Sequence, residues 1–98
     1  MAVKRSVKSG WEPHTYKQAC VAIALHQGNS RVDLIAQATG VSQAGVRGIC
    51  ALLRDAGLVL HMEEFGHGGR SSFWLPVNLE RWRTEVLPVA IARFSKGP

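Results

Sequence analysis

Apolar side chains recur at steps of three and four residues in four segments of the chain, which predicts four helices. The first helix is expected to begin at Thr15, because Thr15 and Gln18 form the threonine-x-x-glutamine pattern of a capping box. Its apolar face consists of Tyr16, Ala19, Cys20, Ile23 and Ala24. Gly28 and Asn29 supply the residues that typically end a helix.

A second, shorter helix is predicted between Ser30 and Gly40. Ser30 is a favourable N-cap residue, and Asp33 at the third helical position completes a similar box. The side chains expected to face inward are Leu34, Ile35 and Ala38. Gly40 ends this helix in a tight turn, since glycine adopts a positive φ at little cost.

A third helix follows directly, with Ser42 as its N-cap and Gly57 as its stop. Its apolar stripe consists of Val46, Ile49, Cys50, Leu53 and Ala56. Two helices that meet across a short glycine turn are typical of a helix-turn-helix unit.

Beyond the third helix the pattern changes to that of short strands. Residues 58–62 and 72–75 are predicted to be two strands of a hairpin. Residues 65–70 between them contain three glycines, so we expect them to form its mobile tip. A hairpin in this position is the wing of a winged helix-turn-helix domain.

A last helix is predicted after Asn78, which we expect to act as its N-cap. Its apolar stripe consists of Leu79, Trp82, Val86, Val89 and Ala90. Pro88 is expected to kink or break this helix, because proline lacks the backbone N–H donor. The stripe either extends the core or forms a dimer contact, and the residues expected at that contact are Leu79, Trp82, Val86 and Val89.

The third predicted helix carries a more specific likeness. The residues Val41-Ser42-Gln43, Val46 and the run from Leu53 to Val59 resemble the recognition-helix signature of ArsR- and MarR-like bacterial regulators. The likeness extends more loosely over residues 15–76. It implies a DNA-binding winged helix-turn-helix domain that acts as a dimer on two-fold-related half-sites.

The chain departs from that family pattern at three places. Gly45 and Gly48 stand where those regulators usually have a hydroxyl residue and a larger polar residue. The cysteine-rich metal box of ArsR-type sensors is missing from the second helix. One fold can serve several functions, so the likeness by itself indicates the fold rather than the ligand.

The predicted fold class is therefore mainly α with a small β-hairpin, an α+β winged helix-turn-helix with an additional C-terminal helix. Residues 1–13 are expected to be a flexible basic arm, and residues 14–77 the winged domain. Residues 78–98 are expected to form the C-terminal helix, a candidate dimerisation element, and a tail. A chain of 98 residues is a single small domain, whose marginal core a dimer would stabilise.

The charge of the chain favours a polyanionic partner. The net charge is +5, and four basic residues lie within the first 17 positions against one acidic residue. Cys20 and Cys50 both lie on apolar faces as free thiols, which fits a reducing cytoplasm. The longest apolar run, residues 19–25, is too short to span a membrane, and we expect a cytoplasmic protein with no membrane partner.

The residues predicted to contact double-stranded DNA come from four parts of the chain. On the third helix, Arg47 can pair with guanine and Gln43 with adenine. Ser42 and the helix N-terminus can hold a phosphate, and the small residues around them allow close approach. The full set of predicted contacts is Ser42, Gln43, Ala44, Arg47, Gly48 and Ala51 on this helix, Arg70 on the wing, Lys17 and Arg31 near helix starts, and Lys4, Arg5 and Lys8 on the arm.

Two other functions stay open at this point. The smooth outer face of the third helix would also suit a protein partner, as in an adaptor that binds transcription machinery. Glu63 and Glu64 lower the charge of the wing, which counts against a tight DNA clamp. A third alternative is a nucleic-acid-binding component of a replication or mobile-element system.

Catalytic and metal chemistry find little support in the sequence. No Gly-x-Ser-x-Gly elbow or Walker-type phosphate loop is present, so we expect no enzyme. His61, Glu63, Glu64 and His67 lie close together in sequence, but they lack the spacing of a zinc site. We therefore expect no metal and no cofactor.

Overall fold

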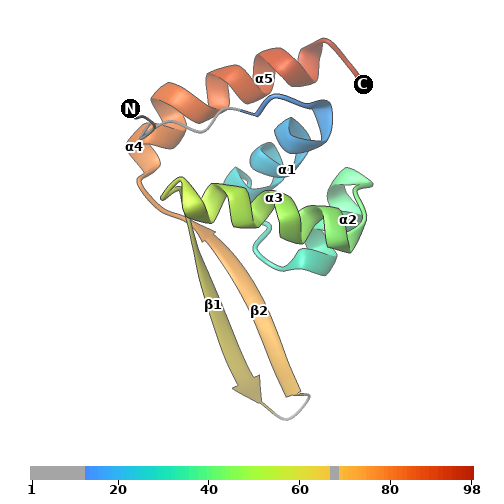
Figure 1. The fold of residues 1–98 in the computed structure, drawn as a ribbon, viewed down its shortest axis with the longest axis vertical. Helices are drawn as coiled ribbons and strands as arrows, with labels where there is room; N and C mark the ends of the chain where they lie inside the picture. The colour runs from blue at the N-terminus through green and yellow to red at the C-terminus, as the bar shows by residue number, and fades with distance from the viewer. Residues whose placement is uncertain (1–12, 67–68) are drawn as a thin grey trace, which may run out of the picture.

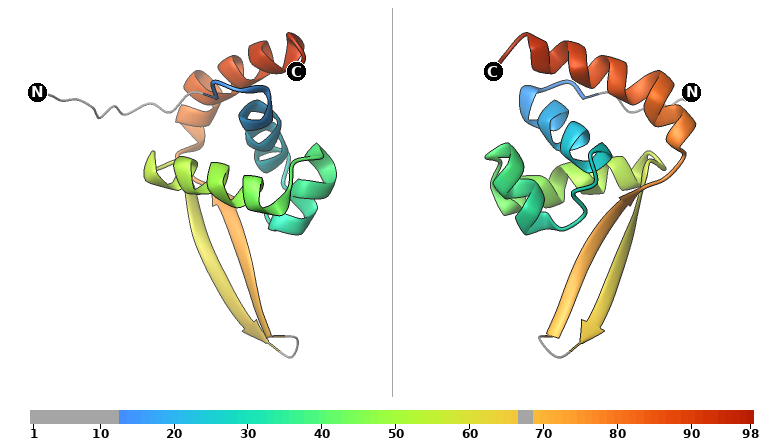
Figure 2. Two further views of the ribbon diagram at one scale, coloured as in Figure 1. Left: turned by 45° about the vertical axis from the view of Figure 1, so that its right-hand side comes forward. Right: turned by 180° about the vertical axis from the view of Figure 1, so that it is seen from behind.

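The computed structural model describes residues 13–66 and 69–98 as a cluster of helices with one long projecting hairpin (Figure 1). In chain order the elements are α1 (Tyr16–His26), α2 (Val32–Thr39), α3 (Gln43–Asp55), β1 (Val59–Gly66), β2 (Gly69–Pro76), α4 (Leu79–Arg81), the π-helical turn η1 (Trp82–Val86) and α5 (Leu87–Ser95). The last three form one continuous C-terminal helical segment, which crosses α1 on the side away from the hairpin (Figure 2).

Helix α1 begins where the capping box predicts. The side-chain oxygen of Thr15 accepts a hydrogen bond from the backbone N–H of Gln18 at 3.1 Å, and Gln18 Oε1 accepts one from the Thr15 N–H at 3.2 Å. More of the surface of α1 is buried than its apolar face predicts, since Val21, Ala22 and Leu25 are also buried. The reason is that α1 is the central helix, with α5 on one side and α2 and α3 on another.

Helix α2 starts one residue later than predicted. Its N-cap is Arg31 rather than Ser30, and no side chain caps it. The backbone of Ser30 is used elsewhere, because its carbonyl accepts a hydrogen bond from the N–H of Trp74 in β2 at 2.8 Å. Arg31 forms a single antiparallel bridge with Phe73 beside it, so this segment is attached to β2 of the two-stranded hairpin.

The inward face of α2 also differs from the prediction. Val32 and Ile35 are buried, whereas Leu34 is 40% exposed and Ala38 is exposed. Val32 and Ile35 lie three positions apart and therefore share the face of α2 that packs on the core.

The turn between α2 and α3 agrees with the prediction. Gly40 ends α2 in the left-handed region at φ 78°, where a side chain would be strained. The Ser42 hydroxyl accepts a hydrogen bond from the Gly45 N–H at 3.1 Å and caps α3. The buried residues of α3 are Val46, Ile49, Cys50 and Leu53, as its apolar stripe predicts.

The hairpin is longer than predicted. Strands β1 and β2 pair antiparallel from Val59 opposite Pro76 to Gly66 opposite Gly69. Residues 65, 66, 69 and 70, assigned to the tip from their glycine content, therefore belong to the strands. The error arose because glycines that lie in a paired strand cannot be told by composition from glycines that lie in a loop.

The C-terminal helix continues through Pro88 without a break. The residues before the proline adopt a π turn, in which the N–H of Leu87 donates to the carbonyl of Trp82. Asn78 occupies the N-cap position, but with φ 55° and no capping hydrogen bond from its side chain. Trp82 and Val86 are fully buried within their own chain, while Leu79 is 60% exposed and Val89 is half-buried.

The buried apolar residues form one core shared by α1, α2, α3, η1, α5 and the base of the hairpin. This arrangement is the predicted α+β winged-helix-like fold, in which α2, α3 and the hairpin follow one another. In the part of the chain that the structure describes, no helix is long and apolar enough to cross a membrane.

Cys50 lies at the centre of this core, and burial raises the pKa of its thiol to about 12 from the ordinary 9.0. The folded chain therefore holds this proton more tightly than the unfolded chain does. We expect the contribution of Cys50 to stability to be complete below pH 9 and to fall by about 1.4 kcal/mol per pH unit between pH 9 and pH 12. Denaturant titrations of the wild type and Cys50→Ala should show a shallower alkaline decline in the variant, and equal declines would contradict the assignment.

Candidate nucleic-acid interface

The outer face of α3 brings together most of the residues predicted to read DNA. Gln43, Ala44, Arg47 and Gly48 are exposed, and Ala51 is half-buried. The Arg47 guanidinium donates to Gln43 Oε1 at 3.4 Å, so the two long polar side chains lie side by side on one edge of the helix. Arginine and glutamine side chains on one exposed helix edge can each contact a base edge, guanine for arginine and adenine for glutamine.

The N-terminus of α3 is capped from one side only. The Ser42 hydroxyl oxygen accepts from the Gly45 N–H, while the N–H groups of Gln43 and Ala44 have no partner within the helix. These donors and the positive end of the helix dipole favour an anionic group at this position.

Several other basic side chains are neutralised by neighbouring carboxylates. Arg31 lies 2.9 Å from Asp33, and Arg54 lies 3.4 Å from Asp55. Arg47 forms no such pair among the described residues, and Lys17 is exposed in the first turn of α1. Arg47 is therefore the basic residue of α3 whose charge is free to act on a ligand.

The two glycines of α3 have different structural roles. A Cβ atom at Gly45 would lie 2.9 Å from Val41 Cγ1 and 3.2 Å from Ser42 Oγ, so a larger residue there would force the Val41 side chain to shift. A Cβ atom at Gly48 would meet nothing within 4 Å. Packing within the chain therefore explains Gly45 and leaves Gly48 unexplained.

Alanine at these two positions should shift stability in opposite directions. Gly48→Ala is expected to raise the free energy of unfolding by about 0.5–1 kcal/mol, because alanine favours the helix. Gly45→Ala is expected to lower it by about 1 kcal/mol, since crowding against Val41 exceeds the same helical gain. Thermal or urea unfolding gives the free energy of unfolding of both variants. A Gly45→Ala variant that is more stable than the wild type would show that Val41 moves aside without cost.

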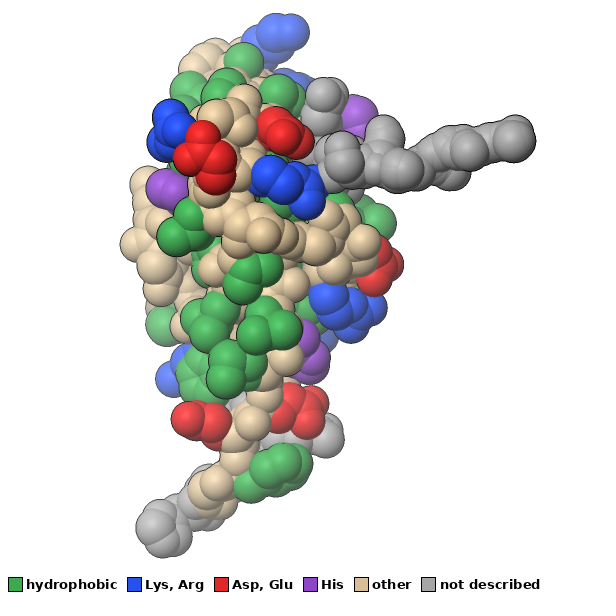
Figure 3. All heavy atoms as spheres, turned by 90° about the vertical axis from the view of Figure 1, so that its left-hand side faces the viewer, with side chains coloured by type: hydrophobic (Ala, Val, Ile, Leu, Met, Phe, Trp, Pro, Cys, Tyr) green, Lys and Arg blue, Asp and Glu red, His purple; other side chains and the backbone are tan. Residues whose placement is uncertain are grey.

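The wing is acidic and apolar rather than basic in its described part. Glu63 and Glu64 are exposed on β1, and Leu60, Met62 and Leu75 are exposed closer to the helices. Figure 3 shows these apolar side chains over the hairpin, with acidic side chains beyond them toward the tip. The alternation of Leu60 and Met62 on a strand was the signal for this surface, and the sequence interpretation overlooked it.

Part of the predicted site is not described. Arg70 pairs through its backbone with Phe65, so the wing places this residue one position from the glycine that ends the strand pairing. Lys4, Arg5 and Lys8 lie outside the described residues. The contacts predicted for them stay predictions.

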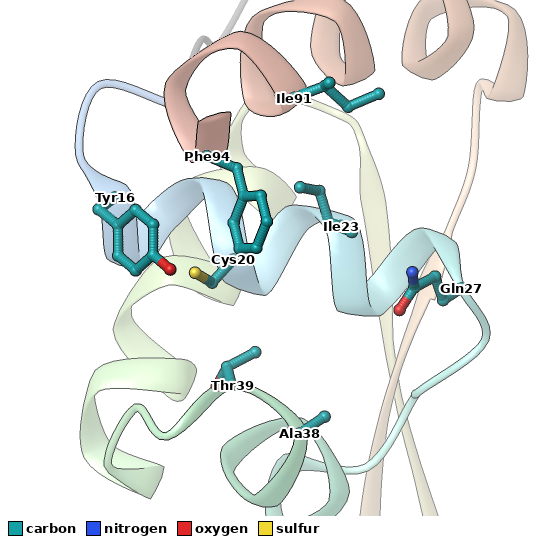
Figure 4. A pocket seen from close by; sticks show the side chains of 8 residues that line it. All are labelled: Tyr16, Cys20, Ile23, Gln27, Ala38, Thr39, Ile91 and Phe94. Atoms are coloured by element: carbon teal, nitrogen blue, oxygen red, sulfur yellow. The ribbon is translucent and has the colours of Figure 1, made fainter. Parts of the chain in front are cut away.

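A groove of about 600 Å³ lies on another side of the molecule, between α1, the end of α2 and α5 (Figure 4). Its lining carries no charged side chain and consists of Tyr16, Cys20, Ile23, Gln27, Ala38, Thr39, Ile91 and Phe94. The rings of Tyr16 and Phe94 stack at 5.5 Å, and Phe94 remains 47% exposed. The periodicity of α1 assigned Tyr16, Cys20 and Ile23 to the core, so the groove was not foreseen.

Comparison with known proteins gives a likeness of fold. No protein-family model matches the chain, and no curated protein sequence does. Among solved structures, the chain is similar to that of BpsR from Bordetella bronchiseptica, with a TM-score of 0.64 and 19% identity over 86% of this chain. It spans 58% of that protein, whose structure was described for the regulation of its DNA binding by 6-hydroxynicotinic acid.

Proposed function

We propose that this domain is a non-enzymatic, sequence-specific DNA-binding protein that regulates transcription in the cytoplasm as a dimer. The observation that carries the proposal is the exposed face of α3. This helix follows a glycine turn from α2, carries Gln43 and Arg47 on one edge, and leads directly into a hairpin. That order of elements is the one that places a recognition helix in the major groove.

Each part of the interface has a separate role in this proposal. Arg47 and Gln43 contact base edges, and the free N–H groups at the start of α3 bind a phosphate. Gly48 allows the helix backbone to approach the duplex closely, which gives a reason for a glycine that nothing inside the chain requires. Lys17, Arg70 and the basic arm add charge, while the Asp33 ion pair makes Arg31 a weak contributor.

The similarity to BpsR supports the proposal at the level of the fold. That protein binds DNA, its DNA binding is regulated by 6-hydroxynicotinic acid, and this chain matches 58% of its length. At 19% identity, the roles of individual residues cannot be transferred from BpsR to this chain. The roles proposed above therefore rest on the geometry of α3 itself.

The direct test is selection of bound duplexes from a random-sequence DNA pool. Enrichment of a defined motif with two-fold symmetry is the expected result, because a dimer presents two recognition helices related by its axis. Weak binding that enriches no motif would reject sequence-specific recognition. The Gly48→Ala variant should stay folded and bind the selected duplex more weakly than the wild type.

The dimer contact proposed here uses the exposed side of α5 in place of the buried pair Trp82 and Val86. Ile91 is 54% exposed at the rim of the apolar groove, next to Phe94. We expect Ile91→Ser to raise the dimer dissociation constant about tenfold or more, since one buried apolar side chain contributes about 1.5–3 kcal/mol.

Sedimentation equilibrium measures this effect. Met62→Ser removes a similarly exposed apolar side chain from the wing and should leave the dimer unchanged. A wild-type chain that stays monomeric at all concentrations would reject the dimer.

A protein-binding winged helix is the second candidate function. It is favoured by the surface of the wing, where Leu60, Met62 and Leu75 are exposed beside two carboxylates. Such a surface repels phosphate and suits a basic apolar segment of another protein. If α3 selects no DNA motif while Leu60→Ser abolishes a defined protein contact, this second function replaces the first.

A further inference from the structure

The point where α3 ends and β1 begins is held by three side chains from the C-terminal segment. Three consecutive backbone carbonyls accept these hydrogen bonds, and no other part of the described chain supplies side-chain donors to them. The donors and acceptors are Arg81 Nη1 to Ala56 O at 3.2 Å, Asn78 Nδ2 to Gly57 O at 2.6 Å, and Trp82 Nε1 to Leu58 O at 2.7 Å.

These contacts stabilise the weakest part of the recognition helix. The last carbonyls of a helix have no partner within it, and the negative end of the helix dipole lies there. The positive guanidinium of Arg81 is well placed to offset that charge. Its Nε also lies 3.7 Å from Glu85 Oε1, so the group is held from its own helix as well.

The part of the C-terminal segment that carries these donors is packed into the core. Trp82 has no exposed surface, and Val86 one turn later is 1% exposed. The π turn keeps the helix hydrogen-bonded up to Pro88, where a regular helix would lose a bond. A displacement of the C-terminal helix would therefore move its donors as a unit rather than one by one.

Two of the acceptor carbonyls lie at the ends of different elements of the proposed DNA interface. Ala56 is the C-cap of α3, and Leu58 directly precedes β1. The segment that holds both thus sets the angle between the recognition helix and the wing. Only Arg81 acts on α3 with a charge, and it reaches the helix end with a long side chain that is 26% exposed.

We propose that Arg81 is a positioning residue, which through the end of α3 sets the orientation of the recognition helix relative to the wing. This inference rests on the proposed DNA-binding function. It makes the C-terminal helix more than a part of the core: movements of that helix, as in dimer formation, are transmitted to the DNA-reading face.

The test compares Arg81→Met with the matched control Arg83→Met. Both variants remove one positive charge, but Arg83 is 69% exposed and pairs only with Glu80 among the described residues. Affinity is measured for the selected duplex and for a random duplex, at a temperature where each variant is folded. Amide signals along α3 and the hairpin are recorded in parallel by heteronuclear NMR.

Arg81→Met is expected to reduce the ratio of specific to random affinity about fivefold or more, the usual size of an energetic coupling. Arg83→Met should change binding to both duplexes little and by a similar factor, because Arg83 is exposed and paired with Glu80. Arg81→Lys keeps the charge and one donor, and should restore part of the ratio. If Arg81→Met does not fold, the ratio of specific to random affinity is compared between Arg81→Lys and the wild type instead, and a reduced ratio in Arg81→Lys supports the positioning role.

An Arg81→Met variant whose ratio matches that of Arg83→Met would overturn the inference. If the wild type selects no duplex, the proposed function fails and the NMR signals decide the positioning role alone. Shifts that extend along α3 as far as Arg47 would support it. Shifts confined to the neighbours of Arg81 would reject it.

Discussion

Replacing Trp82 with alanine is expected to lower the free energy of unfolding by about 3–5 kcal/mol. The indole has no exposed surface, and its Nε1 donates to the Leu58 carbonyl at 2.7 Å. The substitution would leave a cavity beneath the C-terminal helix and would remove one of the two hydrogen bonds to the Leu58 carbonyl, which keeps the bond from the Val77 N–H at 2.9 Å. Since small domains are stable by only about 5–15 kcal/mol, the variant would lose a large fraction of its total stability.

Urea unfolding followed by circular dichroism measures this loss. Trp82→Phe is the matched control, because it keeps most of the apolar volume and removes the N–H donor. We expect it to cost about 0.5–1.5 kcal/mol, the net contribution of one hydrogen bond, because the Leu58 carbonyl still accepts from the Val77 N–H. A loss below about 1 kcal/mol in Trp82→Ala would mean that the indole is not part of the core of the folded chain.

Replacing Arg47 with alanine is expected to weaken binding to the selected duplex by about 1–3 kcal/mol and to relax preference at one base pair. Arg47 is the exposed basic residue of α3 without a carboxylate partner among the described residues, and its guanidinium lies beside Gln43. The effect should therefore fall on sequence preference as well as on affinity. Fluorescence anisotropy at fixed salt, on the selected duplex and its single-base variants, measures both.

Arg54→Ala is the control for the loss of charge from the same helix. Arg54 is exposed but pairs with Asp55, so its removal should change affinity little and leave the base preference intact. An Arg47→Ala variant with unchanged affinity and an unchanged selected motif would remove α3 from the role of recognition helix.

The local chemistry of the sequence was enough to predict α1 and α3. Thr15 with Gln18 and Ser42 with Gly57 supply caps and stops that act within one turn of the helix, and the structure confirms them. The positive φ of Gly40, which ends α2, is likewise a local signal that the sequence predicted. Together with the change from helical to strand periodicity after Gly57, these signals predicted the order of elements and the winged-helix fold.

The start of α2 could not be predicted in this way. Ser30 is a better capping residue than Arg31 by propensity, yet its backbone pairs with Trp74, 44 positions further along the chain. A hydrogen bond between such distant residues outweighs a local preference that amounts to about 1 kcal/mol. The same long-range pairing explains the length of the wing, because its glycines are held by the opposite strand rather than by their own conformation.

For the candidate site, the sequence determined which side chains α3 offers, since Gln43, Arg47 and Gly48 follow from its helical period. Only the tertiary structure decided which of them are free. It paired Arg31 with Asp33, placed Val41 against Gly45, and left open space at Gly48. It also buried Trp82, because an apolar stripe on a helix is equally suited to its own core and to a second chain until the other helices are in place.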